Sequence, residues 1–352
     1  MAKSPYIKRP TSGDVARLAG VSRTTVSLVI NDDPKANISE KTRARVHAAI
    51  AQLDYHPHDA ARNLRSSASR ILGIAIPDAN NPHYLQTFAG IEAYAKDKGY
   101  SPFLSITNFD IKEERRCFEW LKQKRNDALI LISGTGRALL NDLRVMHEHG
   151  YLVTNLSFRT SNMYDANIDS VVPEARVGEQ LLLQHLCDLG HRRIGYIYGV
   201  ANHEVLSDRL TILLEIQRDL GIPVVEEWIY RCGPTTIDGY HATLALLASC
   251  QGKERPSALI AVNDLLATGV LAALAHQGVR VPAEMSVASF DNAPLAPFTV
   301  PALTTVDYDA RAMGEKAARL TLERLAAPDR PSIFVEMPAK LVVRSSTGPC
   351  QG

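Results

Sequence analysis

The chain has 352 residues, more than a single hydrophobic core usually serves, so two or three domains are expected. Its composition, 45% hydrophobic and 22% charged, is typical of soluble globular proteins. No apolar run approaches the roughly 20 residues of a membrane span, and the basic first residues lack the apolar segment of a secretory signal. Five scattered cysteines, none in a C-x-x-C pair, argue against a disulfide framework or a zinc site and favour a reducing, cytoplasmic location.

The charge is unevenly distributed along the chain. Residues 1–70 contain 12 Lys and Arg against 6 Asp and Glu, whereas the rest is mildly acidic and the whole chain has a net charge of +1. A basic head on an acidic body predicts that only the head meets a polyanion. A solvated basic tail is the alternative that charge alone leaves open.

Three short helices are predicted before residue 54. Thr11 and Asp14 have the spacing of a capping box, Gly20 can end the first helix, and Ser22 and Ser39 can cap the next two. Because each helix is too short to be stable alone, the three are expected to share one small core. The predicted core residues are Val15, Leu18, Ala19, Val26, Val29, Ile30, Val46, Ala49, Ile50 and Leu53.

The stretch DVARLAGVSRTTVSLVIN, residues 14–31, has the dimensions of a helix-turn-helix. In that motif the start of the second helix enters the major groove. There Arg23 can hold a guanine with two hydrogen bonds, and Thr24 can donate, accept or contact a thymine methyl. The short polar side chains able to reach phosphates are Ser22, Thr25, Ser27 and Asn31. A helical hairpin of a protein-binding module is the alternative reading of this motif alone.

A polar segment at 57–70 follows the helices. Pro57 ends the third helix, residues 58–65 can form two helical turns, and the serines that follow are typical of a linker. The segment carries too little apolar surface to fold alone, so we expect a helix there only when something holds it.

From residue 71 onward, apolar strand-like runs alternate with helical stretches. Repeated βα units with buried strands predict parallel sheets covered by helices on both faces. The segment is too long for one such sheet, so the predicted fold is an all-α head followed by two doubly wound α/β lobes. No phosphate-binding loop, nucleophile elbow or zinc helix is present, so we predict no enzyme activity, catalytic residue, cofactor or metal.

Several motifs together resemble the lactose-repressor (LacI/GalR) family of bacterial transcription regulators. TSGDVARLAGVSRTTVSLVIND resembles the family's head, LDYHPHDAARNLR its hinge, LCDLGHRRIGYIYG its mid-chain signature and VPAEMSVASFDNAPLAPFTVPALTTV its late signature. They stand in family order across nearly the whole chain. The resemblance implies a homodimer that binds a palindromic operator in double-stranded DNA. It also implies a core of periplasmic-binding-protein type whose two lobes close on a small effector.

The resemblance assigns DNA contacts residue by residue. Arg23, Thr24 and Leu28 stand where the family reads bases, and Leu28 is a departure because an arginine is common there. A leucine can contact a thymine methyl but cannot hydrogen-bond a guanine, so the half-site should differ from the commonest one. The residues matching backbone contacts are Thr11, Ser22, Thr25, Ser27 and Asn31, and those matching the minor-groove hinge are Ala61, Arg62, Leu64 and Arg65.

The resemblance also assigns effector contacts, several of them at strand ends, where open α/β sheets bind ligands. The matching residues are His83, Tyr84, Ser133, Ser157, His203, Arg209, Asn263, Asp291 and Tyr308. Ser157 replaces an aspartate that is common in the family, which argues against a hexose held in the usual pose. Alternatives remain for three residues: Asp264 reads as a helix cap, Asp291 could be a turn residue, and His203 could be a surface residue.

The sequence therefore predicts a head at 1–56, a hinge helix and linker at 57–70 and a core at 71–345. Within the core, the first lobe is expected at about 71–168 and 297–328, and the second at about 169–296 and 329–345. The predicted function is that of a cytoplasmic repressor controlled by a small molecule, a sugar or sugar derivative, with no membrane partner. Nucleosides, organic acids and no effector at all are the alternatives for this ligand. The alternative is a solute-binding receptor without a regulatory role.

Overall fold

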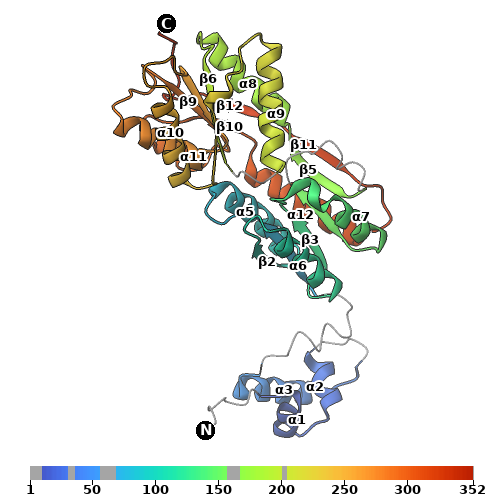
Figure 1. Ribbon diagram of the computed structural model, residues 1–352. Coiled ribbons are helices and arrows are strands. Elements are labelled where there is room, and N and C mark those ends of the chain that lie inside the picture. Colours follow the sequence, from blue (N-terminus) through green and yellow to red (C-terminus); the bar gives the residue numbers. More distant parts are fainter. Residues whose placement is uncertain (1–9, 31–35, 56–68, 157–166, 200–203, 352) are drawn as a thin grey trace, which may run out of the picture. The chain divides into compact units, whose positions relative to one another are not determined.

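The computed structural model describes residues 10–30, 36–55, 69–156, 167–199 and 204–351, apart from the side chains of residues 137 and 204–208. The chain divides into two compact units, Met1–Ser69 and Arg70–Gly352. The first is helical, and the second is built from two α/β lobes (Figure 1). The predicted fold class is confirmed in both parts.

The first unit contains α1 (Ser12–Ala19), α2 (Arg23–Ile30) and α3 (Glu40–Leu53). The capping box of α1 is present, since the Thr11 hydroxyl accepts from the Asp14 amide while the Asp14 carboxylate accepts from the Thr11 amide at 2.9 Å. Gly20 ends this helix in the left-handed conformation, with φ of 63°. The predicted serine caps of α2 and α3 also form, because the Ser22 and Ser39 hydroxyls accept backbone N–H groups three residues later.

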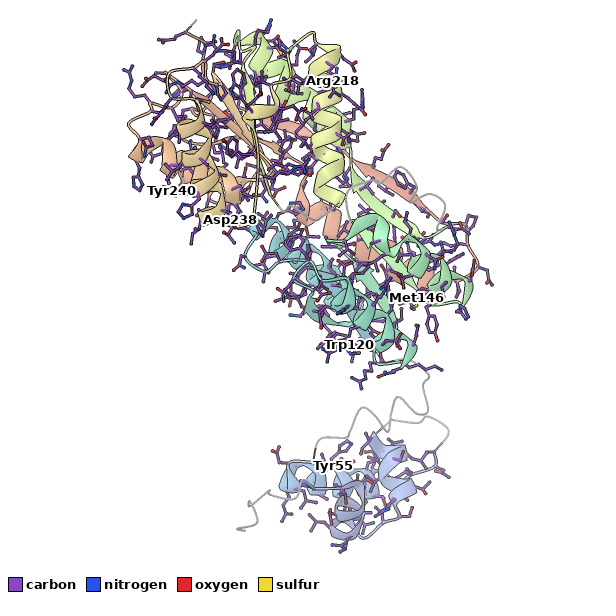
Figure 2. All side chains as sticks on the ribbon, in the orientation of Figure 1. Tyr55, Trp120, Met146, Arg218, Asp238 and Tyr240 are labelled. Atoms are coloured by element: carbon purple, nitrogen blue, oxygen red, sulfur yellow. The ribbon has the colours of Figure 1, made fainter. Side chains whose placement is uncertain are left out.

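The three helices bury one small apolar core, as predicted, with one correction. Leu18, which was expected to point inward, is 46% exposed, and its neighbour Ala16 is buried instead. At the angular spacing of an α-helix, about 100° per residue, Leu18 lies about 105° from the centre of the face that carries Val15, Ala16 and Ala19. Tyr55, labelled in Figure 2, completes the core after α3. The buried residues are Val15, Ala16, Ala19, Val26, Val29, Val46, Ala49 and Tyr55.

The first lobe of the second unit is a six-stranded parallel sheet between two pairs of helices. Its strands are β1 (Ile71–Ile76), β2 (Ser101–Ile106), β3 (Ala128–Leu131), β4 (Val153–Leu156), β5 (Asp169–Pro173) and β11 (Phe334–Met337). Its helices are α5 (Pro82–Asp97), α6 (Ile111–Lys122), η1 (Gly136–Leu139), α7 (Leu140–Glu148) and α12 (Ala310–Ala326). The strand order is β11-β5-β4-β3-β1-β2, with α5 and α12 on one face and α6 and α7 on the other (Figure 1).

The second lobe repeats this plan with one antiparallel edge strand. Its strands are β6 (Ile194–Gly199), β7 (Ile229–Cys232), β8 (Ala258–Ala261), β9 (Ser286–Phe290), β10 (Thr304–Asp307) and β12 (Lys340–Val342). Its helices are α8 (Ala175–Asp188), α9 (Glu204–Asp219), η3 (Glu226–Trp228), α10 (Thr236–Ser249), α11 (Asp264–His276) and η4 (Ala296–Phe298). The strand order is β12-β10-β9-β8-β6-β7, and β12 runs antiparallel to β10. Helices α8 and α9 cover one face, while α10 and α11 cover the other (Figure 1).

The lobe boundaries expected from the sequence are each wrong by one strand. β5 and β11 pair with each other in the first sheet, although residues 169–296 and 329–345 were assigned to the second lobe. β10 pairs with β9 in the second sheet, although residues 297–328 were assigned to the first. The chain therefore crosses between lobes after β5, after β10 and after β11. Strand partners are chosen by long-range hydrogen bonding, which the local apolar pattern does not encode.

The core also extends beyond residue 345, where the sequence placed its end. The Ser346 hydroxyl accepts from the Thr304 amide at 2.8 Å, and the Cys350 amide donates to the Leu189 carbonyl at 2.8 Å. Residues 346–350 therefore belong to the hydrogen-bonded structure of the second lobe.

Helices α5 and α12 approach so closely that two glycines are required at their crossing. A Cβ atom on Gly314 would lie 2.0 Å from the Thr87 carbonyl oxygen, and one on Gly90 would lie 2.0 Å from the Arg311 carbonyl oxygen. We expect Gly314→Ala to lower the free energy of unfolding by about 1–3 kcal/mol, because the two backbones must separate. Urea denaturation measures this loss. The matched variant Glu315→Ala removes one exposed carboxylate from the same helix and should stay within about 0.5 kcal/mol of the wild type. Equal losses of stability in Gly314→Ala and Glu315→Ala would contradict the packing argument.

Candidate functional site

The N-terminal turn of α2 presents the side chains that the sequence selected for base reading. Arg23 and Thr24 are exposed, and Leu28 is partly exposed one turn later. The Arg23 guanidinium lies against the backbone of α1 at Gly13, where an added Cβ would come within 2.5 Å of Nη2. This role of Gly13 depends on a contact between two helices, and its only trace in the sequence is a glycine inside a helical pattern. Because residue 13 is a glycine, the Arg23 guanidinium has room beside α1 while its side chain stays exposed.

The predicted phosphate-contacting residues of the head also serve as helix caps. The Ser22 and Thr25 hydroxyls are 2.9 Å apart, and Ser22 Oγ accepts from the Thr25 amide at 3.0 Å. The Thr11 hydroxyl donates to Asp14 at 2.6 Å, so it is already engaged within α1, and Ser27 is partly buried on α2. The other predicted DNA contacts lie outside the described residues: Asn31, Ala61, Arg62, Leu64 and Arg65.

A cavity of about 50 Å³ lies between the two lobes, beside the points where the chain crosses from one to the other. Most of the predicted effector residues meet there, although they are far apart in sequence; these are His83, Tyr84, Ser133, Arg209, Asn263, Asp291 and Tyr308. Ser157 and His203 lie outside the described residues. The cavity is also lined by side chains that the sequence analysis did not select, namely Asn81, Thr87, Phe109, Ile132, Leu156, Pro173, Val262 and Met313.

Arg209 is fixed by the second lobe before any ligand arrives. It lies in the second turn of α9, and it is 2% exposed. Its Nη1 donates to the Val262 carbonyl at 2.6 Å, its Nε lies 3.2 Å from Glu179 Oε1, and its guanidinium carbon is 4.3 Å from the centre of the Phe290 ring. Burial raises the pKa of Glu179 to about 7, against the lowering effect of the Arg209 charge.

Asp291 connects the two lobes across the cavity. It follows β9 with φ of 104°, so it is both a turn residue and a residue of the cavity wall. Asn81 Nδ2, from the loop after β1, donates to Asp291 Oδ2 at 3.3 Å. His83 Nδ1, in the first turn of α5, lies 3.7 Å from Asp291 Oδ1. The two residues of the first lobe thus face one carboxylate of the second.

The roles of Asn263 and Asp264 differ from those expected. Asn263 caps α11, since its Oδ1 accepts from the Leu266 amide at 2.9 Å, and it also lines the cavity. Asp264 is a buried acceptor that receives the Ser289 hydroxyl, the Thr305 hydroxyl at 2.7 Å and the Ala293 amide at 2.6 Å. Burial and the nearby Asp291 raise its pKa to about 7. Asp264 therefore fixes the turn that carries Asp291, and the reading of Asp264 as the helix cap is wrong.

Ser133 lines the first-lobe side of the cavity, but its hydroxyl is used to hold its own loop. It donates to Glu114 Oε2 at 3.0 Å and accepts the amides of Thr135 and Gly136 at 3.2 and 3.0 Å. The Glu114 carboxylate also accepts the Gly134 amide at 2.6 Å, and burial raises its pKa. Glu114 was not selected from the sequence, where it reads as an ordinary helix carboxylate. It keeps the loop after β3 in place.

No group of His, Cys, Asp and Glu side chains suited to a metal ion occurs within the described ranges. None of the helices described is long and apolar enough to span a membrane. The cavity instead combines an aromatic and aliphatic wall on the first lobe with an arginine, an amide and a carboxylate on the second. Such a pocket suits a small molecule that has both polar and apolar parts.

Comparisons with known proteins match both units. Residues 11–58 match the family described as bacterial regulatory proteins, lacI family, and residues 183–347 match a periplasmic binding protein-like domain. The chain is 31% identical over 340 residues to the HTH-type transcriptional repressor PurR of Pectobacterium carotovorum, covering 96% of each chain. It is 30% identical over 337 residues to PurR of Mannheimia succiniciproducens, covering 96% of this chain and 98% of the relative.

Solved structures agree with the sequence relatives. A Lac repressor dimer bound to operator and the anti-inducer ONPF aligns with a TM-score of 0.81 and 26% identity, covering 97% of this chain and all of that one. A complex of the transcriptional regulator CelR with cellobiose aligns with a TM-score of 0.70 and 26% identity, covering 96% and 100%. A receptor without a regulatory role does not account for the matched head. The chain belongs to the LacI family of bacterial regulatory proteins and is an effector-responsive, DNA-binding transcriptional repressor rather than an enzyme.

Proposed function

We propose that the protein is a homodimeric repressor of the bacterial cytoplasm, associated with the nucleoid when it binds a palindromic operator. Its effector, a sugar or sugar derivative, binds between the lobes. The observation that carries the proposal is the convergence of Arg209, Asn263 and Asp291 on one interlobe cavity in a chain with an exposed reading helix. Two solved relatives support the proposal. One is a complex with cellobiose, and the other is a dimer bound to operator.

Selection of bound duplexes from a random DNA pool tests the operator part of the proposal. We expect the full-length protein to enrich a palindrome with an easily kinked central step, because two equal heads read two equal half-sites. Enrichment of a single unpaired site would contradict the dimer. Repeating the selection with a metabolite mixture identifies compounds that strengthen or weaken binding, and therefore tests whether a sugar acts on this protein.

An exposed apolar segment supports the homodimer. Leu295, Phe298 and Val300 lie in η4 or directly beside it, and they are 62%, 79% and 90% exposed. Clusters of large exposed apolar side chains are typical of protein interfaces. The double variant Phe298→Glu with Val300→Glu is expected to weaken dimerisation by about 100-fold or more, as measured by sedimentation equilibrium.

The matched control for dimerisation is Val145→Glu, which places the same charge on a partly exposed position of α7. It should leave the dimer intact. A dimer of unchanged stability in the double variant would place the interface elsewhere.

Leu64 is proposed to wedge into the central step of the operator, as the family resemblance implies. Leu64→Ala is expected to weaken binding to the selected palindrome by about tenfold or more, because the kinked duplex loses the apolar group that holds it open. Binding to scrambled DNA should keep its affinity and its steep dependence on salt. Leu64→Met, which retains an apolar wedge, should recover most of the specific affinity. Full specificity in Leu64→Ala would contradict the wedge.

A further inference from the structure

The positive charge in the effector cavity already has a buried acidic partner within the protein. Among the described residues that line it, Arg209 is the side chain with a permanent positive charge. Its Nε is paired at 3.2 Å with Glu179, whose side chain is 0% exposed, and its Nη1 is bonded to a backbone carbonyl. A ligand carboxylate or phosphate would have to compete with this buried partner for the guanidinium.

The walls around Arg209 contain further carboxylates. Asp291 lines the same cavity, and Asp78 lines a smaller cavity that shares Asn81, Tyr84 and other residues with it. Tyr84 lines both cavities and senses all of these groups: burial raises its pKa most, Asp291 and Asp78 raise it further, and Arg209 opposes them. The field at the centre of the cavity therefore favours positive charge and hydrogen-bond donors.

The Asp291 carboxylate can accept a further hydrogen bond from a ligand. It is 8% exposed, and the hydrogen bond it receives from Asn81 is long, at 3.3 Å. His83 Nδ1, 3.7 Å away, lies beyond hydrogen-bond distance, and no partner for it is found among the described residues. A buried carboxylate and a buried ring nitrogen thus face the cavity with incomplete hydrogen bonding, which costs free energy until a ligand supplies the missing groups.

We propose that the effector carries no negative charge and donates hydrogen bonds to Asp291, as a neutral polyol or a protonated amine does. Carboxylate and phosphate-ester forms of the same molecule are rejected by the carboxylates around the cavity. This inference depends on the proposed function, since it places the effector between the lobes. It narrows the effector from any sugar derivative to neutral or amino forms, and excludes sugar acids and sugar phosphates.

The test measures the sign of the field inside the cavity with a pair of thiol reagents that differ in charge. Phe109→Cys places a thiol on the cavity wall in the full-length protein. This thiol is modified with two methanethiosulfonate reagents, one carrying a trimethylammonium group and one carrying a sulfonate. Peptide mass spectrometry follows each reaction and distinguishes the introduced cysteine from the five native cysteines. Both rates are divided by those of free 2-mercaptoethanol. We expect a preference of about tenfold for the cationic reagent.

Adding Asp291→Asn should reduce this preference by about threefold or more, because one carboxylate is removed from the wall. The matched control Asp219→Asn removes an exposed carboxylate at the end of α9 and should change nothing. A normalised preference of one or below, or one that Asp291→Asn leaves unchanged, overturns the inference. Met313→Cys, elsewhere on the cavity wall, repeats the measurement should Phe109→Cys fail to fold.

Protection of the introduced thiol then tests the ligand class directly. Glucose, glucosamine, gluconate and glucose 6-phosphate serve as matched probes that differ in charge. Stronger protection by either anion than by glucose contradicts the inference. The measurements need no DNA, so failure of the operator selection would count against the proposed function while leaving the sign of the cavity field intact.

Discussion

Replacing Asp169 by alanine is expected to lower the free energy of unfolding by about 3–5 kcal/mol, the largest stability effect we predict for a single side chain. Asp169 begins β5 and is buried between two arginines. Its carboxylate accepts Arg324 Nε and Nη2 at 3.1 and 2.9 Å, Arg330 Nη1 and Nη2 at 2.9 and 2.7 Å, and the Ile333 amide at 2.8 Å. The variant leaves both guanidinium groups beside a cavity with no counter-charge.

The effect is large because Asp169 joins three elements of the first lobe. It ties β5 to the end of α12 through Arg324, and to the segment entering β11 through Arg330 and Ile333. Urea denaturation followed by circular dichroism measures the loss. Asp142→Ala, which breaks an exposed pair with Arg115, is the control and should cost under about 1 kcal/mol. If Asp169→Ala lowered the free energy of unfolding no more than Asp142→Ala does, the buried network would contribute little to stability.

The same carboxylate predicts a pH dependence whose sign follows from its pKa. Burial acts to raise the pKa of Asp169, but hydrogen bonds from Arg324 and Arg330 outweigh it and hold the pKa below its ordinary value. Its stabilising contribution is therefore fully present above about pH 4 and is lost as pH falls through its lower folded-state pKa. Asp169→Asn should flatten the acid limb of the stability curve.

Asp264 acts in the opposite direction, because burial and the nearby Asp291 raise its pKa to about 7. Its contribution is present below its ordinary pKa, near 4, and is lost as pH rises through about 7. Between these limits stability should decline with pH, and Asp264→Asn should reduce that slope.

The helix ends of the head could be predicted from the sequence because caps are local. Thr11, Gly20, Ser22 and Ser39 act within four residues of their own position, so their spacing carries the information. Leu18 was misplaced because a helix of eight residues has too few apolar positions to define its buried face.

The convergence of the predicted polar residues on one cavity could be anticipated from the sequence, whereas the side chains that hold them in place could not. Asn263 and Asp291 follow strands, which marks the ligand edge of a parallel sheet. Glu179 and Glu114 were invisible because their roles depend on Arg209 and on a distant loop that only the folded chain brings to them. The exchange of roles between Asn263 and Asp264 has the same cause, since Asp264 accepts hydrogen bonds from Ser289 of β9 and Thr305 of β10.

Arg23→Ala is expected to produce the largest loss of DNA recognition among single changes in the head. Arg23 is exposed on the first turn of α2, where a guanidinium can hold a guanine with two hydrogen bonds. Its loss should weaken the selected operator by about 10- to 150-fold and relax the base preference at one position of each half-site. Arg23→Lys should not recover this preference, because lysine lacks the planar fork.

Gly13 separates recognition by Arg23 from the stability of the head. A Cβ on Gly13 would come within 2.5 Å of Arg23 Nη2, the mobile end of a long side chain, so Gly13→Ala displaces the guanidinium rather than the backbone. Alanine also favours the helix by about 1 kcal/mol relative to glycine. We therefore expect Gly13→Ala to raise the melting temperature of the head while weakening the operator complex, as measured by calorimetry and fluorescence anisotropy. Arg17→Ala, which removes a charge that is 82% exposed on α1, should leave the base preference unchanged. Parallel losses of stability and affinity in Gly13→Ala would mean that α1 supports the fold of the head and does not position its reading arginine.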